Sequence, residues 1–256
     1  MNSINNTIFI GKVLHFYETL PSTNILAAEM LDRQVLREGT TILTFNQSAG
    51  KGQLNNKWES EAEKNIAVTV VLKPDFLPLQ QNFLLNQAIA LGVYDFIRLF
   101  VKEKVTIKWS NDIYVADKKI AGILIQNSIQ GQQFQHSVVG IGININQAIF
   151  KSDAPNPTSI FLETGKEISL WSAVDFLCKY LENRYLQLKS NQFDLIKTDY
   201  HDVLYRINEW HGFESNGHIF QGKIKGVSDS GQLLMQTADE EKSFSFKEIK
   251  FLPTYD

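Results

Sequence analysis

The chain has a single cysteine, Cys178, so it can form neither an internal disulfide nor a metal site built from several cysteines. It also lacks an excess of either charge: 25 lysine and arginine residues stand against 28 aspartate and glutamate residues, a net charge of −3. No overall basic field is therefore present to attract nucleic acid. No apolar run reaches the length of a membrane span, and the N-terminal MNSINNTIF lacks the charged and apolar regions of a signal peptide. We predict a cytoplasmic protein with neither nucleic acid nor a membrane as partner.

Apolar residues are abundant instead, at 43% of 256 residues, which suffices for one large core and a small second one. Up to residue 207 the patterns predict strands and long helices, including helices at 79–100, 169–189 and 193–207. From residue 208 the chain changes to short alternating runs with turns such as Asp229-Ser230-Gly231, typical of a small β-barrel. We predict two domains, 1–207 and 208–256. Alternatively, the second domain serves only as a structural cap on the first domain. No site residue is predicted in it.

Residues 105–126, VTIKWSNDIYVADKKIAGILIQ, predict a β-hairpin. The first strand ends at Asn111-Asp112, the pattern resumes at 113–116, and 119–126 returns after a turn at 117–118. The polar face of this hairpin, or the positions beside it, carry Lys108, Asn111, Asp112, Lys119 and Gly122. These residues also fit a plain structural role, since a lysine pair at a turn is often a solvated charge and Asn-Asp often only forms the turn.

A glycine-rich stretch, residues 45–60, has the composition of a loop that holds an anion. Gly50 and Gly52 free the backbone to point amide hydrogens at a ligand, and Lys51 and Lys57 add positive charge. The spacing matches neither a GxxxxGK[ST] phosphate-binding loop nor a GxGxxG dinucleotide turn. A flexible surface loop explains the composition equally well.

Two further segments combine structural and ligand-binding patterns. Residues 20–34 predict a helix with Ser22 or Thr23 as the N-cap. Residues 138–146 predict a strand with valine and isoleucine on one side and Gly140, Gly142 and Asn144 on the other. The side without bulky residues suits a flat ligand lying against the backbone, or a helix packed over the glycines.

Four blocks of this sequence follow one another as they do in the biotin–protein ligase family: QSAGKGQLNNKW (47–58), KWSND (108–112), KKIAGIL (118–124) and GIGININ (140–146). The family's loop usually reads GRGRxGR before a tryptophan, and its second block usually reads KWPND followed by KxxGIL. With Ser-Thr-Asn at 22–24, the chain resembles this family closely over residues 13–146 and loosely elsewhere. The resemblance implies an α+β fold with a central mixed or antiparallel β-sheet flanked by helices, like a class II synthetase core, and a small SH3-like β-barrel at the C-terminus.

The resemblance also implies a two-step ligase reaction. The carboxylate of biotin attacks the α-phosphate of ATP to give biotinyl-5′-AMP and pyrophosphate, and a lysine of a biotin carboxyl carrier protein then attacks the mixed anhydride. ATP and Mg²⁺ are the expected cofactors, and biotin is the substrate. Only about a dozen residues precede the core, which leaves no room for a DNA-binding domain, so the short form of the family is expected, as a monomer or a homodimer.

Individual roles are carried over from the family's motifs. Lys119 is expected nearest the biotin carboxylate and the α-phosphate, with Lys51 assisting, while Asp112 orients the acceptor ammonium or takes its proton. The expected biotin-binding residues are Ser22, Thr23, Asn24, Gln47, Gly50, Lys51, Gly52, Gln53, Lys119 and Gly122. The expected ATP-binding residues are Trp58 and Asn144 at the adenine, with Asn111. Asp112 is also expected to act indirectly on the metal ion.

Some positions depart from the family's pattern: Gln53, Asn55 and Asn56 replace two basic residues and a glycine of the loop, and Ser110 replaces a proline. Fewer cations in the loop predict weaker retention of biotinyl-AMP than in arginine-bearing relatives. Two other functions fit the same residues. A lipoate– or octanoate–protein ligase shares the fold and the chemistry, and a non-catalytic biotin sensor would explain the thinned basic loop, although Asp112 and Lys119 are retained.

Overall fold

The computed structural model describes residues 4–52, 57–151 and 156–253. Its centre is a seven-stranded mixed sheet with the order β1-β2-β5-β9-β8-β7-β6. The strands are, in that order, Leu14–Tyr17, Thr41–Thr44, Ile66–Leu72, Gln133–Ile143, Lys118–Gln130, Asp112–Val115 and Val105–Lys108. Only β1 and β2 pair in parallel; every other neighbouring pair is antiparallel. The predicted α+β class with a mixed central sheet is confirmed.

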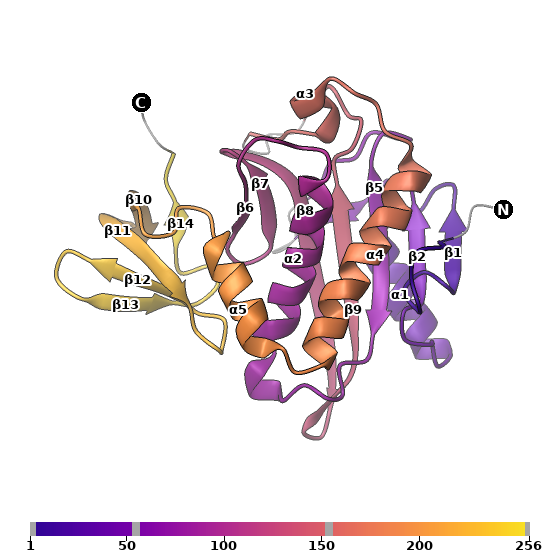
Figure 1. The fold of residues 1–256 in the computed structure, drawn as a ribbon, viewed down its shortest axis with the longest axis horizontal. Coiled ribbons are helices and arrows are strands. Elements are labelled where there is room, and N and C mark those ends of the chain that lie inside the picture. The colour runs from indigo at the N-terminus through magenta and orange to yellow at the C-terminus, as the bar shows by residue number, and fades with distance from the viewer. Residues whose placement is uncertain (1–3, 53–56, 152–155, 254–256) are drawn as a thin grey trace.

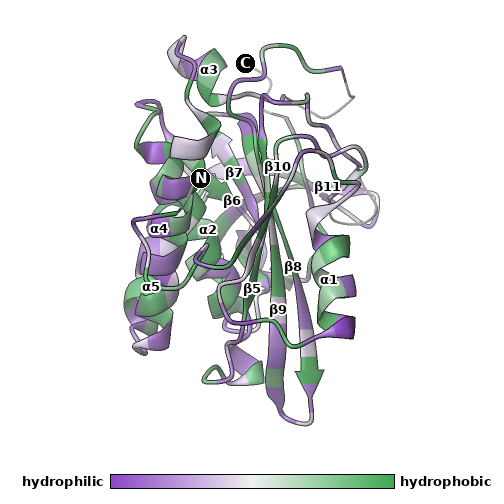
Figure 2. Ribbon diagram, turned by 90° about the vertical axis from the view of Figure 1, so that its right-hand side faces the viewer, coloured by the Kyte–Doolittle hydropathy of each residue, from purple (hydrophilic) through white to green (hydrophobic). Residues whose placement is uncertain are grey.

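Helices cover both faces of this sheet, as Figures 1 and 2 show. Helix α1 (Thr23–Arg33) lies on one face, while α2 (Phe83–Arg98), α4 (Leu170–Lys189) and α5 (Phe193–Asp202) lie on the other. The predicted helix at 79–100 is divided into a 3-10 turn (Leu79–Gln81) and α2, and the helix predicted at 193–207 ends already at residue 202. A short helix, α3 (Ile160–Thr164), precedes α4.

The core lies between the sheet and the group of three helices. All residues of β5 are buried, as expected for an interior strand of a sheet covered on both faces. Gly92 lets α2 and α4 approach closely, because a Cβ there would lie 3.0 Å from the Cα of Leu181. Glu182 of α4 is also buried, and its carboxylate accepts hydrogen bonds from three consecutive backbone N–H groups at residues 8–10. This contact ties the N-terminal segment to α4.

The predicted hairpin is formed by β7 and β8, and β6 pairs with β7 as its other neighbour. Strand β7 begins at Asp112, one residue before the predicted start, and β8 continues past Gln126 to Gln130. The extension arises because β8 and β9 pair along almost their whole length, from Ala121↔Ile143 to Gln130↔Gln133. Each strand thereby satisfies the other's backbone groups beyond the edge of the helices.

The C-terminal residues form a separate antiparallel sheet with the order β13-β12-β11-β10-β14. Its strands are β10 (Trp210–Ser215), β11 (His218–Val227), β12 (Leu233–Thr237), β13 (Glu241–Phe244) and β14 (Lys250–Phe251). The predicted turn at 229–231 joins β11 and β12, and the sheet is compatible with an SH3-like domain. Residues 204 and 207 bridge to β6 and β11 respectively, so the predicted boundary at 207/208 stays a prediction. Among the described residues, no helix has the length and apolarity needed to cross a membrane.

Candidate functional site

A cavity of about 270 Å³ lies against the large sheet, on the face that carries α1, whose first residues line it. Its walls come from the start of α1, from the loop after β2, from the hairpin of β3 (Gly50–Lys51) and β4 (Lys57–Trp58), and from β7, β8 and β9. Most of the residues predicted for the site line it: Ser22, Thr23, Asn24, Gln47, Lys51, Gly52, Trp58, Asn111, Asp112, Lys119 and Gly122. Gly50 and Asn144 do not line this cavity, and Gln53 falls outside the described residues.

Lys119 and Asp112 form an ion pair in the cavity, with 2.8 Å between Nζ and Oδ1. Strict alternation would put Lys119 and Gly122 on opposite faces of β8, since they lie three positions apart. The register between β7 and β8 shifts after Ile113↔Ala121, so that Tyr114 pairs with Lys119. This β-bulge gives β8 an additional residue, Ile120, and turns Lys119 to the cavity face beside Gly122. The position of the Lys119 ammonium in the cavity therefore depends on a β-bulge that the hydrophobic pattern of the sequence did not reveal.

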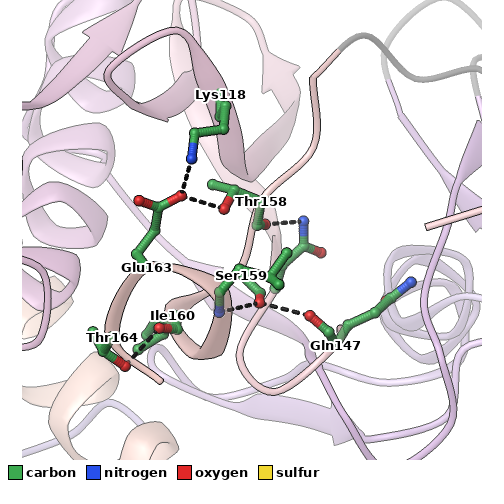
Figure 3. Close-up of polar contacts among 9 residues, drawn as sticks. Lys118, Gln147, Thr158, Ser159, Ile160, Glu163 and Thr164 are labelled. Carbon is green, nitrogen blue, oxygen red and sulfur yellow. Dashed lines mark hydrogen bonds and ion pairs between the residues drawn. The ribbon is translucent and has the colours of Figure 1, made fainter. Parts of the chain in front are cut away.

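The neighbouring lysine, Lys118, points elsewhere. Its ammonium lies 2.6 Å from a carboxylate oxygen of Glu163 on α3, and Glu163 also accepts a hydrogen bond from Thr158 (Figure 3). The backbone of Lys119 pairs with the same segment, accepting from Thr158 N–H and donating to the carbonyl of Asn156, both at 2.8 Å. Residues 156–158 thus support the strand that carries Lys119. Of the two lysines, only Lys119 lines the cavity.

Gly122, Gly140 and Gly142 form the floor of the cavity, and other side chains lie directly on them. A Cβ on Gly142 would be 2.5 Å from the indole of Trp58, and one on Gly140 would be 2.1 Å from Oδ1 of Asn24. The sequence predicted that either a flat group or a helix would lie against these glycines. In the structure, the indole ring of Trp58 lies against Gly142 and the start of α1 lies against Gly140. The indole Nε1 is buried and finds no hydrogen-bond partner among the described residues. An unpaired buried donor costs roughly 1–3 kcal/mol, which a ligand acceptor would recover.

The start of α1 is buried and capped from outside the helix. Ser22 occupies the N-cap position, as predicted, but its side chain makes no capping hydrogen bond. The amide oxygen of Gln47 takes this role instead, accepting from Thr23 N–H at 3.0 Å. Thr69 of β5 lies 2.8 Å from the hydroxyl of Thr23 and 2.6 Å from Oδ1 of Asn24. The hydroxyl of Ser22 is left available to the cavity, which it lines.

The β3–β4 hairpin covers one side of the cavity. Gly50 pairs with Trp58 and Lys51 with Lys57. A Cβ on Gly50 would lie 2.7 Å from the carbonyl oxygen of Trp58 and 2.8 Å from Nε2 of Gln47, so glycine is needed for this close approach. Trp58 also lies near Lys119, whose ammonium is 5.6 Å from the ring centroid. The glycine-rich loop and the β7–β8 hairpin therefore meet at one site.

The two asparagines predicted for ATP differ in their surroundings. Asn111 is buried, with its amide group donating to the carbonyl of Ile123 and accepting from the hydroxyl of Ser110. These contacts hold the turn between β6 and β7. Asn144 is also buried; its Nδ2 donates to the carbonyl of Thr158 at 2.9 Å, but its Oδ1 has no partner among the described residues. Asn144 thus has a free acceptor, whereas the amide of Asn111 is already used.

Lys108, predicted on the polar face, lies outside the cavity in an aromatic cage. Its ammonium is 4.8 Å from the ring centroid of Tyr114 and 5.0 Å from that of Phe251, and it donates to the hydroxyl of Tyr114 at 3.2 Å. Burial lowers the pKa of Lys108, against the attraction of Asp112, which raises it. The described residues contain no group of three or more His, Cys, Asp or Glu side chains that could hold a metal ion.

Several residues of the cavity wall were not predicted. Trp109, Ile123 and Leu124 lie beside predicted residues in the chain and could have been found by extending the motifs. Phe246 is different, because it follows β13 in the C-terminal sheet and reaches the cavity only through the fold. Nothing in the local sequence around Phe246 indicates a binding site.

Comparison with known proteins gives a consistent result. The family model described as "Biotin/lipoate A/B protein ligase family" matches residues 16–144. The bifunctional ligase/repressor BirA of Bacillus subtilis (strain 168) is 28% identical over 249 residues, covering 95% of this chain and 75% of its own length. The biotin–[acetyl-CoA-carboxylase] ligase of Paracoccus denitrificans is 30% identical over 201 residues, covering 76% of this chain and 83% of its own.

A solved structure shows the same fold. The biotin protein ligase from Aquifex aeolicus in complex with biotin and ATP superposes with a TM-score of 0.77 at 24% identity. The match covers 95% of this chain and all of the other chain (100%), so it includes both sheets.

Proposed function

Because this chain belongs to the biotin/lipoate A/B protein ligase family, we propose that it activates biotin with ATP and transfers it to a lysine of a biotin carboxyl carrier protein. The reaction passes through biotinyl-5′-AMP, and the chain is a ligase. The relative from Paracoccus denitrificans and the solved structure from Aquifex aeolicus are named for biotin, not lipoate, which favours the biotin branch of the family.

One observation carries this proposal: Lys119, Lys51 and the polar residues at the start of α1 line a single cavity. The first step brings together a carboxylate and a polyphosphate, which repel each other. Fixed cations offset this repulsion and stabilise the charge that develops at the α-phosphate. Lys119 is held by Asp112 at 2.8 Å, so its ammonium is already positioned beside the floor of the cavity. Lys51 adds a second cation from the β3–β4 hairpin.

Asp112 acts in the second step. The pair with Lys119 is only partly buried, with side-chain exposures of 28% and 29%, so an incoming cation can reach the carboxylate. When Lys119 turns to the anhydride, Asp112 is left to orient the acceptor ammonium and to take its proton. The neutral amine then attacks the carbonyl carbon, the C–N bond forms, AMP leaves with the electrons of the broken C–O bond, and the nitrogen releases its remaining extra proton to solvent.

We assign the two substrates to different groups of residues, most of which line the cavity, although Asn144 does not. Ser22, Thr23, Asn24 and Gln47 supply hydroxyl and amide groups for the polar ring of biotin. Thr23 is fixed by hydrogen bonds with Gln47 and Thr69, and Asn24 by one with Thr69. The free Oδ1 of Asn144 can accept a hydrogen bond from the amino group of adenine, and Trp58 offers a ring face and an unpaired N–H. These assignments are part of the proposal.

Mg²⁺ fits this site only together with the nucleotide. Asp112 is the one carboxylate among the described lining residues, and it is already paired with Lys119. Mg²⁺ usually binds through one or two carboxylates and substrate phosphates. We therefore expect the ion to be held mainly by the phosphates of ATP, with Asp112 acting through water.

The proposal is tested by biotin-dependent exchange of pyrophosphate into ATP, with lipoate as the alternative substrate. We expect exchange with biotin and none with lipoate. Lys119→Ala removes a cation aligned with the developing charge, so exchange is expected to fall by roughly 10²–10³-fold. Lys118→Gln is the matched control, since Lys118 pairs with Glu163 outside the cavity and its loss leaves the rate near that of the parent. A parent that exchanges with lipoate, or not at all, contradicts the proposal.

A further inference from the structure

The C-terminal sheet contributes an aromatic side chain to the wall of the cavity. Phe246, in the segment between β13 and β14, lines the cavity and is 40% exposed. Its ring lies against that of Trp109, with 6.1 Å between the centroids and an angle of 61° between the planes. Phe246 therefore has one side on Trp109 and remains accessible from the solvent. Such a position is typical of the rim of a binding site.

The order of strands shows which side of the cavity Phe246 borders. The cavity crosses the sheet from β5 and β9, where Thr23 and Asn24 lie, over β8 to Asp112 on β7. Beyond β7 come Trp109 and Ser110, in the turn that follows β6, and then Phe246. Asp112 thus separates Phe246 from the polar residues of α1. A group that enters beside Phe246 meets Asp112 before it meets α1.

The β11–β12 turn fixes this arrangement. The indole N–H of Trp109 donates to the carbonyl of Gly231 at 3.0 Å. Gly231 has a φ of +87°, and a Cβ there would lie 2.7 Å from the ring of Phe83 on α2. Next to it, Asp229 forms an ion pair of 2.6 Å with Lys197 on α5. The turn is held by β6, α2 and α5 together, so the C-terminal sheet has a defined position relative to the cavity.

We propose that Phe246 is a specificity-determining residue for the acceptor, contacting the lysine side chain of the carrier protein as it reaches Asp112. This inference rests on the proposed function. A lysine side chain has an apolar stem of four carbons and a charged end. The ring of Phe246 is suited to the stem, and the carboxylate of Asp112 to the ammonium. The contact is absent for a small nucleophile that has no stem.

The experiment separates the two steps. Parent, Phe246→Ala and Phe246→Leu proteins are loaded with biotinyl-AMP in a single turnover, and the complex is mixed with a purified, unbiotinylated biotin carboxyl carrier domain or with hydroxylamine. Ile219→Ala is the matched control, because Ile219 belongs to the same sheet, is 70% exposed and does not line the cavity. Biotin-dependent pyrophosphate exchange of each protein is measured in parallel, together with its melting temperature.

We expect Phe246→Ala to lower kcat/KM for the carrier domain about tenfold, the size of a contact worth ~1.4 kcal/mol. Discharge to hydroxylamine and pyrophosphate exchange should change far less, and Phe246→Leu should restore most of the transfer. Equal losses in exchange and in transfer would assign Phe246 to the nucleotide site and overturn the inference, as would unchanged transfer in Phe246→Ala. Absence of exchange in the parent itself would instead contradict the proposed function.

Discussion

The two sides of the cavity are built differently. On the side of α1, the lining residues Ser22, Thr23 and Asn24 are small, polar and buried. Thr23, Asn24, Gln47 and Thr69 form a continuous hydrogen-bond network. On the side of the C-terminal sheet, Trp109 and Phe246 present aromatic surface, and Phe246 is partly exposed. The polar side is preorganised to recognise a small buried group. The aromatic side can adapt to a larger partner that arrives from solvent, which is what a reaction with a small substrate and a protein substrate requires.

The largest effect on this contrast is expected from Gly140→Ala. The new Cβ would lie 2.1 Å from Oδ1 of Asn24, so Asn24 and the start of α1 must move. A displacement of about 1 Å at a binding site can cost roughly 10²-fold in rate. We expect kcat/KM for biotin in pyrophosphate exchange to fall by that order. Gly212→Ala on the C-terminal sheet is the control, since the nearest atom would be 3.4 Å from the new Cβ. An equal loss of kcat/KM for biotin in Gly212→Ala would contradict the difference between the two sides of the cavity.

Gln47→Ala should have the next largest effect. Gln47 caps α1 through Thr23 N–H, so its loss leaves a helix end unsatisfied and costs about 1 kcal/mol of stability, as for other N-caps. The KM for biotin should also rise, because Gln47 lines the cavity. Thermal unfolding and exchange kinetics measure the two consequences. Ser22→Ala, which removes no capping bond, should leave the melting temperature unchanged, and an equal drop would show that Ser22 is the cap.

Gly231→Ala tests the aromatic side of the cavity, because the carbonyl of Gly231 accepts the hydrogen bond that holds Trp109. The positive φ of +87° and the approach to Phe83 make alanine unfavourable by roughly 1–3 kcal/mol. We expect a lower melting temperature and slower transfer to the carrier domain, with a smaller change in exchange. If exchange falls as much as transfer, the turn supports the whole cavity and the two sides are not independent.

The smallest effect concerns Lys108, which lies where the two sheets meet. Burial lowers its pKa, so between the native pKa and the ordinary value of 10.5 the unfolded chain binds more protons than the folded one. Stability from this group therefore rises with pH in that interval. As the pH rises toward 10.5, the melting temperature of the parent should therefore increase relative to that of Lys108→Met. A constant difference between the two proteins would show that Lys108 does not titrate in this range.

Most of the polar side could be found from sequence. The blocks around Ser22–Asn24, Gln47–Gly52 and 108–124 identify it, because short segments with special backbone requirements carry both the fold and the ligand contacts. Three features were not predictable. The bulge that turns Lys119 inward depends on pairing with β7, the capping of α1 by Gln47 depends on a loop 24 residues away, and Phe246 depends on the position of the second sheet.

The sequence by itself determined the α+β class, the hairpin from 105 to 126, the glycine positions and the membership in a ligase family, because these follow from local patterns and motif order. Only the tertiary structure revealed the β-bulge that turns Lys119, the lysine indicated by the motifs, toward the cavity, and the aromatic residue of the second sheet that lines it. Both depend on register and packing between segments distant in the chain, and side-chain direction reverses with a shift of a single residue.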